Sequence, residues 1–231
     1  MTLNEIKELY TELQKNYDEI KSIELTNELS KLNDINTLEF HYNILKKQDN
    51  LYLFYDVRGI FDEHGEAGKE FLLEKLHTEK DPDLKAEALF ILGVMECQEV
   101  KPIALEFLKS KNYKQQYYGI IVIGWLGNSE DIPVLEKEMM KNDEHQLRLY
   151  AATALRQIFF NHAKLKKKII LAYWNALNTE EDVEVAKAII ACVQDLLKTK
   201  LGIRESMTEG MIGNLDIAKP KAIKAINKFL S

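Results

Sequence analysis

The stretch YYGIIVIGWLGN, residues 117–128, is the most apolar passage of the chain. As a membrane span it reaches only about half the required length, since a helix that crosses a bilayer needs about 20 apolar residues. As a β-strand it would stand almost alone, because strand signals are nearly absent elsewhere. Two of its glycines, Gly119 and Gly124, instead occupy positions that recur in neighbouring segments. We therefore predict a helix that packs against other helices on several sides.

A small residue recurs along the chain at a nearly constant spacing. Ala88, Gly119 and Ala151 are separated by 31 and 32 residues. Positions n, n+4, n+7 and n+8 around each of them lie on one face of an α-helix, so each copy predicts a helix with one packed face. The matching groups are Leu84-Lys85 and Ile91-Leu92-Gly93, Gln115-Gln116 and Val122-Ile123-Gly124, and Leu147-Arg148 and Ala154-Leu155-Arg156, with looser copies at 53–62 and 180–197.

A second helix is expected in each repeat. Polar connectors separate the first helices from four further amphipathic segments, at 66–77, 100–110, 130–141 and 163–177. One helical hairpin cannot bury its own apolar face, so several hairpins must stack into a continuous array. The sequence therefore predicts an all-α fold, an α-α superhelix of helical hairpins.

The whole chain, residues 1–231, is expected to form a single α-solenoid domain. Residues 1–48 show helical periodicity without the small-residue register, which is typical of N-terminal capping helices. Residues 49–200 hold about four to five repeats. Residues 201–231 are expected to form a C-terminal capping helix that begins after Asn214 as its N-cap.

Two segments carry a resemblance to a known family. DPDLKAEALFILG (81–93) and DEHQLRLYAATALRQ (143–157) combine an Asp-containing turn, a Leu-Lys or Leu-Arg pair and a small residue. In this they resemble the first helix of HEAT repeats, and the resemblance covers roughly residues 50–200. It departs from the family pattern at Gln116, where a basic residue is usual. The resemblance implies helical-hairpin architecture and says little about function.

Charge limits the classes of partner. The chain has 37 Asp and Glu against 31 Lys and Arg, a net charge of −6. This acidic balance disfavours nucleic acid, because phosphate contacts need a surplus of Lys and Arg, and it favours a basic protein partner. The first residues form a charged amphipathic pattern rather than a signal peptide, and no apolar run could span a membrane. A cytoplasmic protein is therefore expected.

Motifs of catalysis and metal binding are missing from the sequence. The two cysteines, Cys97 and Cys192, lie in apolar runs and are expected to be core residues. The five histidines lack the spacing of metal ligands, and His64, in FDEHGEAG, is expected in a solvated loop. No nucleophile or phosphate-loop motif occurs. We predict no catalytic, cofactor-binding or metal-binding residue, and hence a protein that is not an enzyme.

Outward positions of the second helices form the candidate binding site. In arrays of this kind the second helices usually line the concave surface, and their outward positions here are acidic. An acidic concave stripe would steer a cationic protein and hold it by charge-assisted hydrogen bonds. The predicted partner-binding residues are Glu70, Glu74, Glu106, Glu136 and Glu138.

By size, charge and architecture the chain is similar to helical-repeat immunity proteins of bacterial toxin systems. This similarity implies a non-catalytic inhibitor that neutralises a basic, nuclease-like toxin. A generic HEAT-repeat scaffold or adaptor is the alternative. A third possibility is an enzyme like the DNA glycosylases built from HEAT-like helices, with Trp125 or Trp174 and the lysines of KLKKK (Lys164, Lys166, Lys167 and Lys168) on its DNA-binding face. A solvated helix start is the favoured explanation of these lysines.

Overall fold

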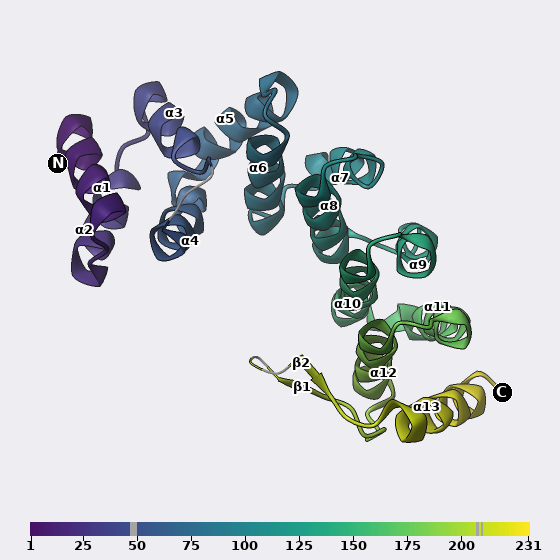
Figure 1. Cartoon of the computed structure of the whole chain (residues 1–231). Helices are drawn as coiled ribbons and strands as arrows, with labels where there is room; N and C mark the ends of the chain where they lie inside the picture. Colours follow the sequence, from purple (N-terminus) through teal and green to yellow (C-terminus); the bar gives the residue numbers. More distant parts are fainter. Residues whose placement is uncertain (47–49, 207, 209) are drawn as a thin grey trace. The chain divides into compact units, whose positions relative to one another are not determined.

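The computed structural model describes residues 1–46, 50–206, 208 and 210–231. The chain forms two compact units, unit 1 (Met1–Val100) and unit 2 (Lys101–Ser231). Both are built from helices joined by short connectors (Figure 1). The all-α prediction is confirmed, and the helix register expected from the sequence is confirmed with it.

Unit 1 contains the helices of the N-terminal segment and the first copies of the repeat. Within it α1 packs on α2, α2 on α4, and α5 on α6. Tyr42 and Phe61 are among its largest fully buried side chains. Its elements are α1 (Leu3–Lys15), α2 (Glu19–Leu29), α3 (Ile35–Asn43), α4 (Leu51–Gly59), the 3-10 helix η1 (Phe61–His64), α5 (Gly65–Thr78), α6 (Pro82–Val94) and the 3-10 helix η2 (Gln98–Val100).

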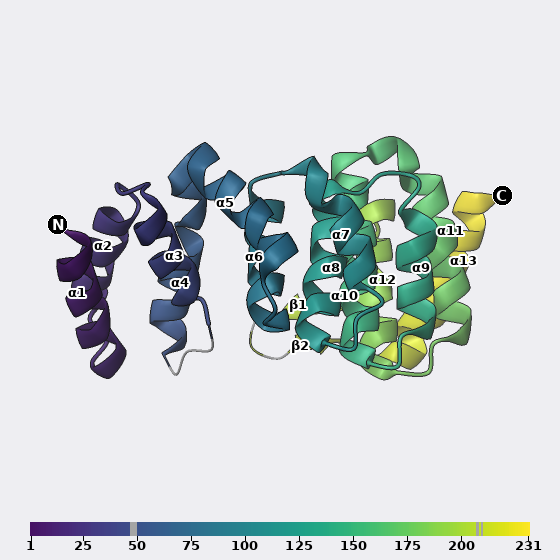
Figure 2. The ribbon, with the colours of Figure 1, turned by 90° about the horizontal axis from the view of Figure 1, so that it is seen from above.

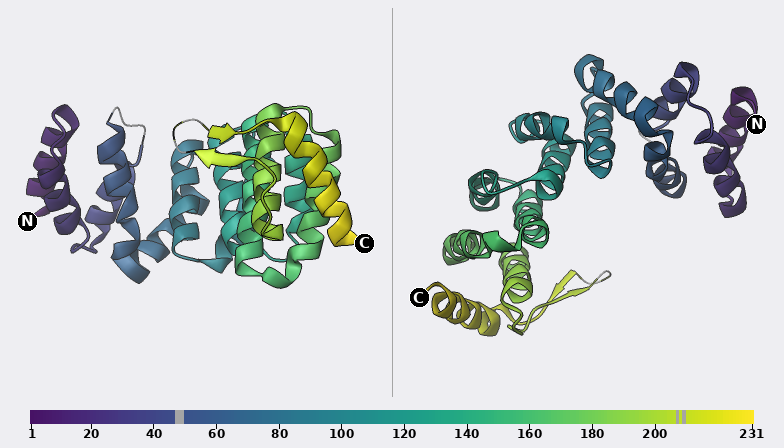
Figure 3. Two further views of the ribbon diagram at one scale, coloured as in Figure 1. Left: turned by 90° about the horizontal axis from the view of Figure 1, so that it is seen from below. Right: turned by 180° about the vertical axis from the view of Figure 1, so that it is seen from behind.

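Unit 2 arranges its helices in two layers. Helices α8, α10 and α12 form one layer, while α7, α9 and α11 form the other (Figure 1), and their axes lie side by side when viewed from above (Figure 2). Helix α13 packs on both α11 and α12 and crosses α12 obliquely (Figure 3). The elements are α7 (Lys101–Phe107), α8 (Tyr113–Leu126), α9 (Ile132–Lys141), α10 (His145–Asn161), the 3-10 helix η3 (Ala163–Leu165), α11 (Lys166–Thr179), α12 (Val183–Leu197), β1 (Arg204–Ser206), β2 (Gly210–Ile212) and α13 (Leu215–Leu230).

Side-chain caps explain where the helices begin. Asp81 accepts hydrogen bonds from the backbone N–H groups of Asp83 and Leu84, and Pro82 occupies the first turn of α6. Such caps satisfy N–H groups that have no partner within the helix. Asp or Asn residues at Asp18, Asp34, Asn50, Asn112, Asp182 and Asn214 cap α2, α3, α4, α8, α12 and α13 in the same way. The acidic and amide residues of the connectors are thus explained by helix geometry.

The segment before α13 differs from the prediction of a capping helix alone. Strands β1 and β2 pair as an antiparallel hairpin, which lies on the side of α12 away from α11 (Figures 1 and 3). The side-chain oxygen of Gln194 accepts hydrogen bonds from the N–H groups of Leu201, Gly202 and Ile203. This anchoring by a glutamine on α12 is a tertiary contact, so the sequence pattern gave no signal for it.

In helix α8, the segment from which the repeat was recognised, 7 of the 14 residues are buried. Gly119 lies close to α7, because a Cβ at this position would be 2.8 Å from the carbonyl oxygen of Ala104. Gly124 lies equally close to α10, where a Cβ would be 3.0 Å from the Cα of Ala154. Helix α10 therefore covers the side of α8 that carries Gly124.

The close approach at Gly119 gives a stability prediction. Replacing Gly119 by Leu should lower the stability of unit 2 by about 3 kcal/mol or more, because the side chain would overlap the backbone of α7 and the clash exceeds the roughly 1 kcal/mol gain in helix propensity. Thermal unfolding followed by circular dichroism measures the change. Gly59→Leu is the matched control, since a Cβ at Gly59 meets nothing within 4 Å. Equal melting temperatures for the two variants would contradict the packing described here.

Candidate functional site: two grooves along helix α11

Helix α11 leaves apolar side chains at the surface. Ile170, Tyr173 and Leu177 are buried against its neighbours, yet Leu171 is 47% exposed and Trp174 is half-buried. Leu171 and Trp174 are three residues apart and share one side of the helix. Helices α9 and α13 both pack against α11. One groove lies between α9 and α11, and a second lies between α13 and the turn that follows α11.

The first groove lies between α9 and α11 and has a volume of about 630 Å³. Pro133 and Met140 from α9 and Trp174 from α11 supply its apolar wall. The amide of Asn175 donates a hydrogen bond of 2.7 Å to the Glu136 carboxylate across it. The groove thus combines an apolar lining with a few oriented polar groups, which is typical of binding clefts.

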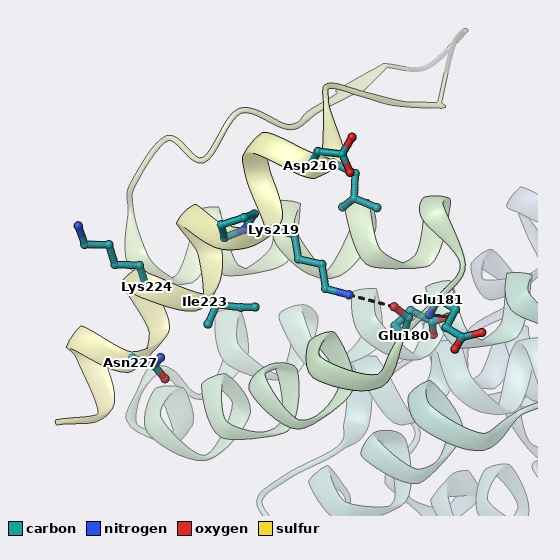
Figure 4. A pocket seen from close by; sticks show the side chains of 9 residues that line it. Glu180, Glu181, Asp216, Lys219, Ile223, Lys224 and Asn227 are labelled. Carbon is teal, nitrogen blue, oxygen red and sulfur yellow. Dashed lines mark hydrogen bonds between the residues drawn. The ribbon is translucent and has the colours of Figure 1, made fainter.

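The second groove lies beneath α13 and has a volume of about 970 Å³ (Figure 4). Its α13 side presents Pro220 and Ile223 between two lysines, and Lys219 donates a hydrogen bond of 3.1 Å to the carbonyl oxygen of Glu180. The indole N–H of Trp174 donates to the side-chain oxygen of Asn227 at 2.9 Å. Trp174 therefore belongs to the wall of the first groove and also joins α11 to the helix that forms the second.

A buried ion pair holds the turn that closes the second groove. The guanidinium of Arg148 binds the Glu180 carboxylate through two hydrogen bonds, of 3.0 and 3.1 Å. The side chains are only 17% and 7% exposed. A two-point Arg–carboxylate pair is geometrically restrictive, so it positions the α11–α12 turn. Since Glu180 is neutralised by Arg148, the unpaired acids that remain at this groove are the exposed Glu181 and Asp216.

Residues 70–156 match the family model of HEAT repeats. The matched segment extends from α5 to α10 and contains α6, α8 and α10, the three helices that carry the small-residue register. A search of curated proteins gave no match to the chain. The HEAT-repeat segment accounts for the stacked helical hairpins, and HEAT repeats are typical of helical scaffolds and protein-binding modules.

The five glutamates predicted as a binding stripe have different environments. Glu70 and Glu74 are exposed on α5 in unit 1, and Glu106 is exposed on α7 in unit 2. Glu136 and Glu138 on α9 are half-buried, and Glu138 accepts a hydrogen bond from the Asn142 amide at 3.0 Å. Of the five, only Glu136 lines one of the two α11 grooves. Their role in binding stays a prediction.

The lysines of KLKKK surround the start of α11. Lys168 donates to the carbonyl oxygen of Ser129, and the ammonium of Lys166 lies 5.0 Å from the centre of the Phe229 ring. Lys164 and Lys167 are exposed. Trp125 is on α8 and Trp174 is on α11, so the two tryptophans belong to different layers of unit 2 (Figure 1).

His64 is not in a solvated loop, as the sequence suggested, but is buried with His41 in unit 1. The Nε2 atom of His41 lies 2.7 Å from the carbonyl oxygen of Val57, and its Nδ1 atom lies 2.7 Å from Nε2 of His64. With both rings neutral, His41 donates from Nε2 to Val57 and accepts at Nδ1 from Nε2 of His64. Nδ1 of His64 must then accept a hydrogen bond, so the Asn33 side chain 2.8 Å away turns its amide NH2 group toward it. Burial lowers the pKa of His41 to about 3 and also lowers the pKa of His64. The pair fills the core of unit 1, and nothing in the local sequence signals a contact across 23 residues.

The prediction that both cysteines are core residues is confirmed, since Cys97 and Cys192 are buried free thiols. Burial raises the pKa of Cys192 to about 12 and raises that of Cys97, so neither is poised as a thiolate nucleophile. Among the residues that the structure describes, no cluster of three or more His, Cys, Asp or Glu side chains could hold a metal ion. In the same described part of the chain, no helix is both long and apolar enough to span a membrane.

The buried histidine pair predicts acid sensitivity. Histidine in the unfolded chain titrates near pH 6.5, whereas burial keeps His41 neutral down to a pKa of about 3, so the unfolded state binds more protons as the pH falls. Stability should therefore be complete above pH 6.5 and decrease below it, with His41 alone contributing a loss of about 2 kcal/mol between pH 7 and pH 5.

Urea unfolding at pH 7 and pH 5 measures this loss. The double variant His41→Gln with His64→Gln keeps polar groups at both positions but cannot titrate, so the difference between the two pH values should shrink. His77 and His145 are exposed and remain in both proteins as internal controls. Equal stability of the unsubstituted protein at pH 5 and pH 7 would show that the pair is not held neutral.

Proposed function

We propose that this protein is a non-catalytic protein-binding module that holds its partner on the α9–α11–α13 face of unit 2. The observation that carries this proposal is Trp174, which lines the groove of about 630 Å³ and donates a hydrogen bond to Asn227 of the groove of about 970 Å³, with Leu171 exposed one turn away on the same side of α11. The HEAT-repeat match over residues 70–156 supports a binding or scaffolding role in general. The location on α11 comes from the geometry of these grooves.

The chemistry of the face suits a protein partner. Trp side chains at the centre of an interface contribute large apolar area at low entropic cost, and interface energy concentrates at such residues. Here Trp174 is already held by its hydrogen bond to Asn227, so little ordering remains to be done on binding. The lysines and acids at the groove edges, such as Lys137 and Glu181, supply the polar rim.

The environments of the cysteine and histidine side chains favour a non-catalytic role. The thiols have raised pKa values because they are buried, and His41 and His64 lie in the core of unit 1 away from solvent. Active sites typically bring perturbed titratable groups to a cleft. The two α11 grooves are instead lined by apolar side chains, amides, lysines and glutamates with ordinary partners.

The proposed face can be tested by one substitution and a matched control. Leu171→Glu places a charge one turn from Trp174 on the same side of α11 and should weaken partner capture at least tenfold, which corresponds to about 1.4 kcal/mol. Val94→Glu is the control, because Val94 on α6 is 48% exposed and Leu171 is 47% exposed. Proteins crosslinked to the chain in its native cells are quantified by mass spectrometry for each variant. A partner that is lost equally with both variants, or with neither, would refute the proposed face.

A finer form of this proposal is an immunity-type inhibitor that neutralises a basic, nuclease-like toxin in the cytoplasm. It is supported by the net charge of −6, by the exposure of Glu70, Glu74 and Glu106, and by the position of Glu136 in the α9–α11 groove. Exposed acidic residues would attract a cationic protein over long range and speed its association. A generic HEAT-repeat scaffold is compatible with the same face but requires no basic partner.

Charge reversal separates these two forms. Replacing Glu70, Glu74, Glu106 and Glu136 together by Lys should slow association with a basic partner by tenfold or more at low salt, with a smaller effect at high salt where the charges are screened. The control reverses Glu8, Glu63, Glu96 and Glu130, which are also exposed and change the net charge equally. Stopped-flow association rates with the captured partner measure the effect. Equal slowing in both variants would show that net charge causes the effect, and would contradict a role for the predicted stripe of glutamates.

A further inference from the structure

The two units of the chain carry opposite charge. Unit 1, residues 1–100, has 22 Asp and Glu against 11 Lys and Arg, a net charge of −11. Unit 2, residues 101–231, has 15 against 20, a net charge of +5. One copy of the protein therefore offers both an acidic and a basic surface to another copy, and the net charge of −6 conceals this division.

Unit 1 has an exposed acidic and apolar surface on α2, which we call the α2 patch. It consists of Glu19, Ile20, Ile23 and Glu24, which lie on one side of the helix. Ile20 is 80% exposed and Ile23 is 55% exposed, an unusual pair for a solvated surface. The neighbouring Lys21 is already paired with Glu12, so its charge does not cancel that of the patch.

Unit 2 has the complementary surface on α13, which we call the α13 patch. It consists of Ile217, Lys221, Lys224 and Lys228, which follow one another at helical spacing along a narrow stripe. Ile217 is 55% exposed, and all three lysines are exposed. Within the described part of the chain, none of these three lysines forms an ion pair with a carboxylate.

We propose that the protein associates with itself head to tail, with the α2 patch of one copy seated on the α13 patch of the next. Glu19 and Glu24 would face the α13 lysines, while Ile20 and Ile23 would be covered together with Ile217. Burial of these isoleucines supplies the attraction that isolated surface ion pairs lack. Pairing of two α2 patches or of two α13 patches is disfavoured because like charges would meet.

This contact joins two different patches, so in an open chain of copies the first and last copies each keep one patch free. The chain of copies can also close into a ring, and the smallest ring is a dimer in which each copy seats its α2 patch on the other. The mass in solution should therefore reach twice that of the monomer or more once association is advanced. The monomer has a mass of 26.8 kDa, which gives the reference.

Sedimentation velocity over a series of protein concentrations tests the association directly. At low ionic strength the mass should rise above 26.8 kDa with concentration, and at 1 M salt, where the Debye length is about 3 Å, it should return toward the monomer. A wild-type protein that remains monomeric at every concentration at low salt overturns the proposal.

Charge-swapped variants test the two patches. Glu19→Lys with Glu24→Lys, and separately Lys221→Glu, Lys224→Glu and Lys228→Glu together, should each weaken self-association tenfold or more. Mixing the two variants should restore it, because the basic α2 patch of one then meets the acidic α13 patch of the other, and the remaining native patches also match. Failure of the mixture to co-assemble, with both variants fully helical by circular dichroism, refutes the pairing.

Controls with the same charge changes exclude a general electrostatic effect. Glu70→Lys with Glu74→Lys matches the first variant, and Lys109→Glu, Lys111→Glu and Lys141→Glu matches the second, since all five residues are exposed. Both control proteins should self-associate as the wild type does. The Leu171→Glu variant should also self-associate normally while it loses its partner protein. The experiments therefore distinguish an error in the proposed partner-binding face from an error in the proposed self-association.

Discussion

Close approach of neighbouring helices at small side chains is the constraint on which unit 2 depends. At Gly124 the backbone of α8 comes so near to α10 that a Cβ would lie 3.0 Å from Ala154, and at Gly119 the same helix touches the backbone of α7. Each glycine costs helix propensity of about 1 kcal/mol relative to Ala. Burial of Ile120, Val122 and Ile123 on the same helix more than offsets that cost, since each buried aliphatic side chain contributes about 1.5–3 kcal/mol.

The same packing determines which side chains remain for binding. Helices α7 and α10 cover one side of α8, while Tyr113, Tyr117, Ile121 and Trp125 keep partial or full exposure on the other. Helix α11 contacts α9, α12 and α13 but is apolar on a wider arc than these neighbours cover, so Leu171 and Trp174 stay at the surface. Single exposed apolar residues are common on protein surfaces and need no explanation. An exposed apolar residue that also borders a groove, as Trp174 does, indicates a binding surface.

The array of helices could be predicted from the sequence because its cause is local and periodic. The small residue recurs at Ala88, Gly119 and Ala151, and the side-chain caps Asp81 and Asn112 precede the first two of these helices at the same offset. Both features act within one or two turns. The His41–His64 contact, the anchoring of the hairpin by Gln194 and the grooves beside α11 depend on residues brought together from distant positions. A periodic sequence pattern cannot predict such contacts. The exposure of Leu171 and Trp174 could be predicted in part, because both residues are outside the spacing of the buried residues of α11.

Helix α13 connects the two proposed interactions. Lys224 belongs to the α13 patch and also lines the groove of about 970 Å³ that α13 shares with the α11–α12 turn. A partner that fills this groove and a second copy seated on the α13 patch would therefore compete for the same lysine side chain. The α9–α11 groove, which contains Trp174 but no residue of α13, is free of that competition. A partner anchored there could stay bound while copies associate, whereas one that extends across α13 would release the next copy and limit the assembly.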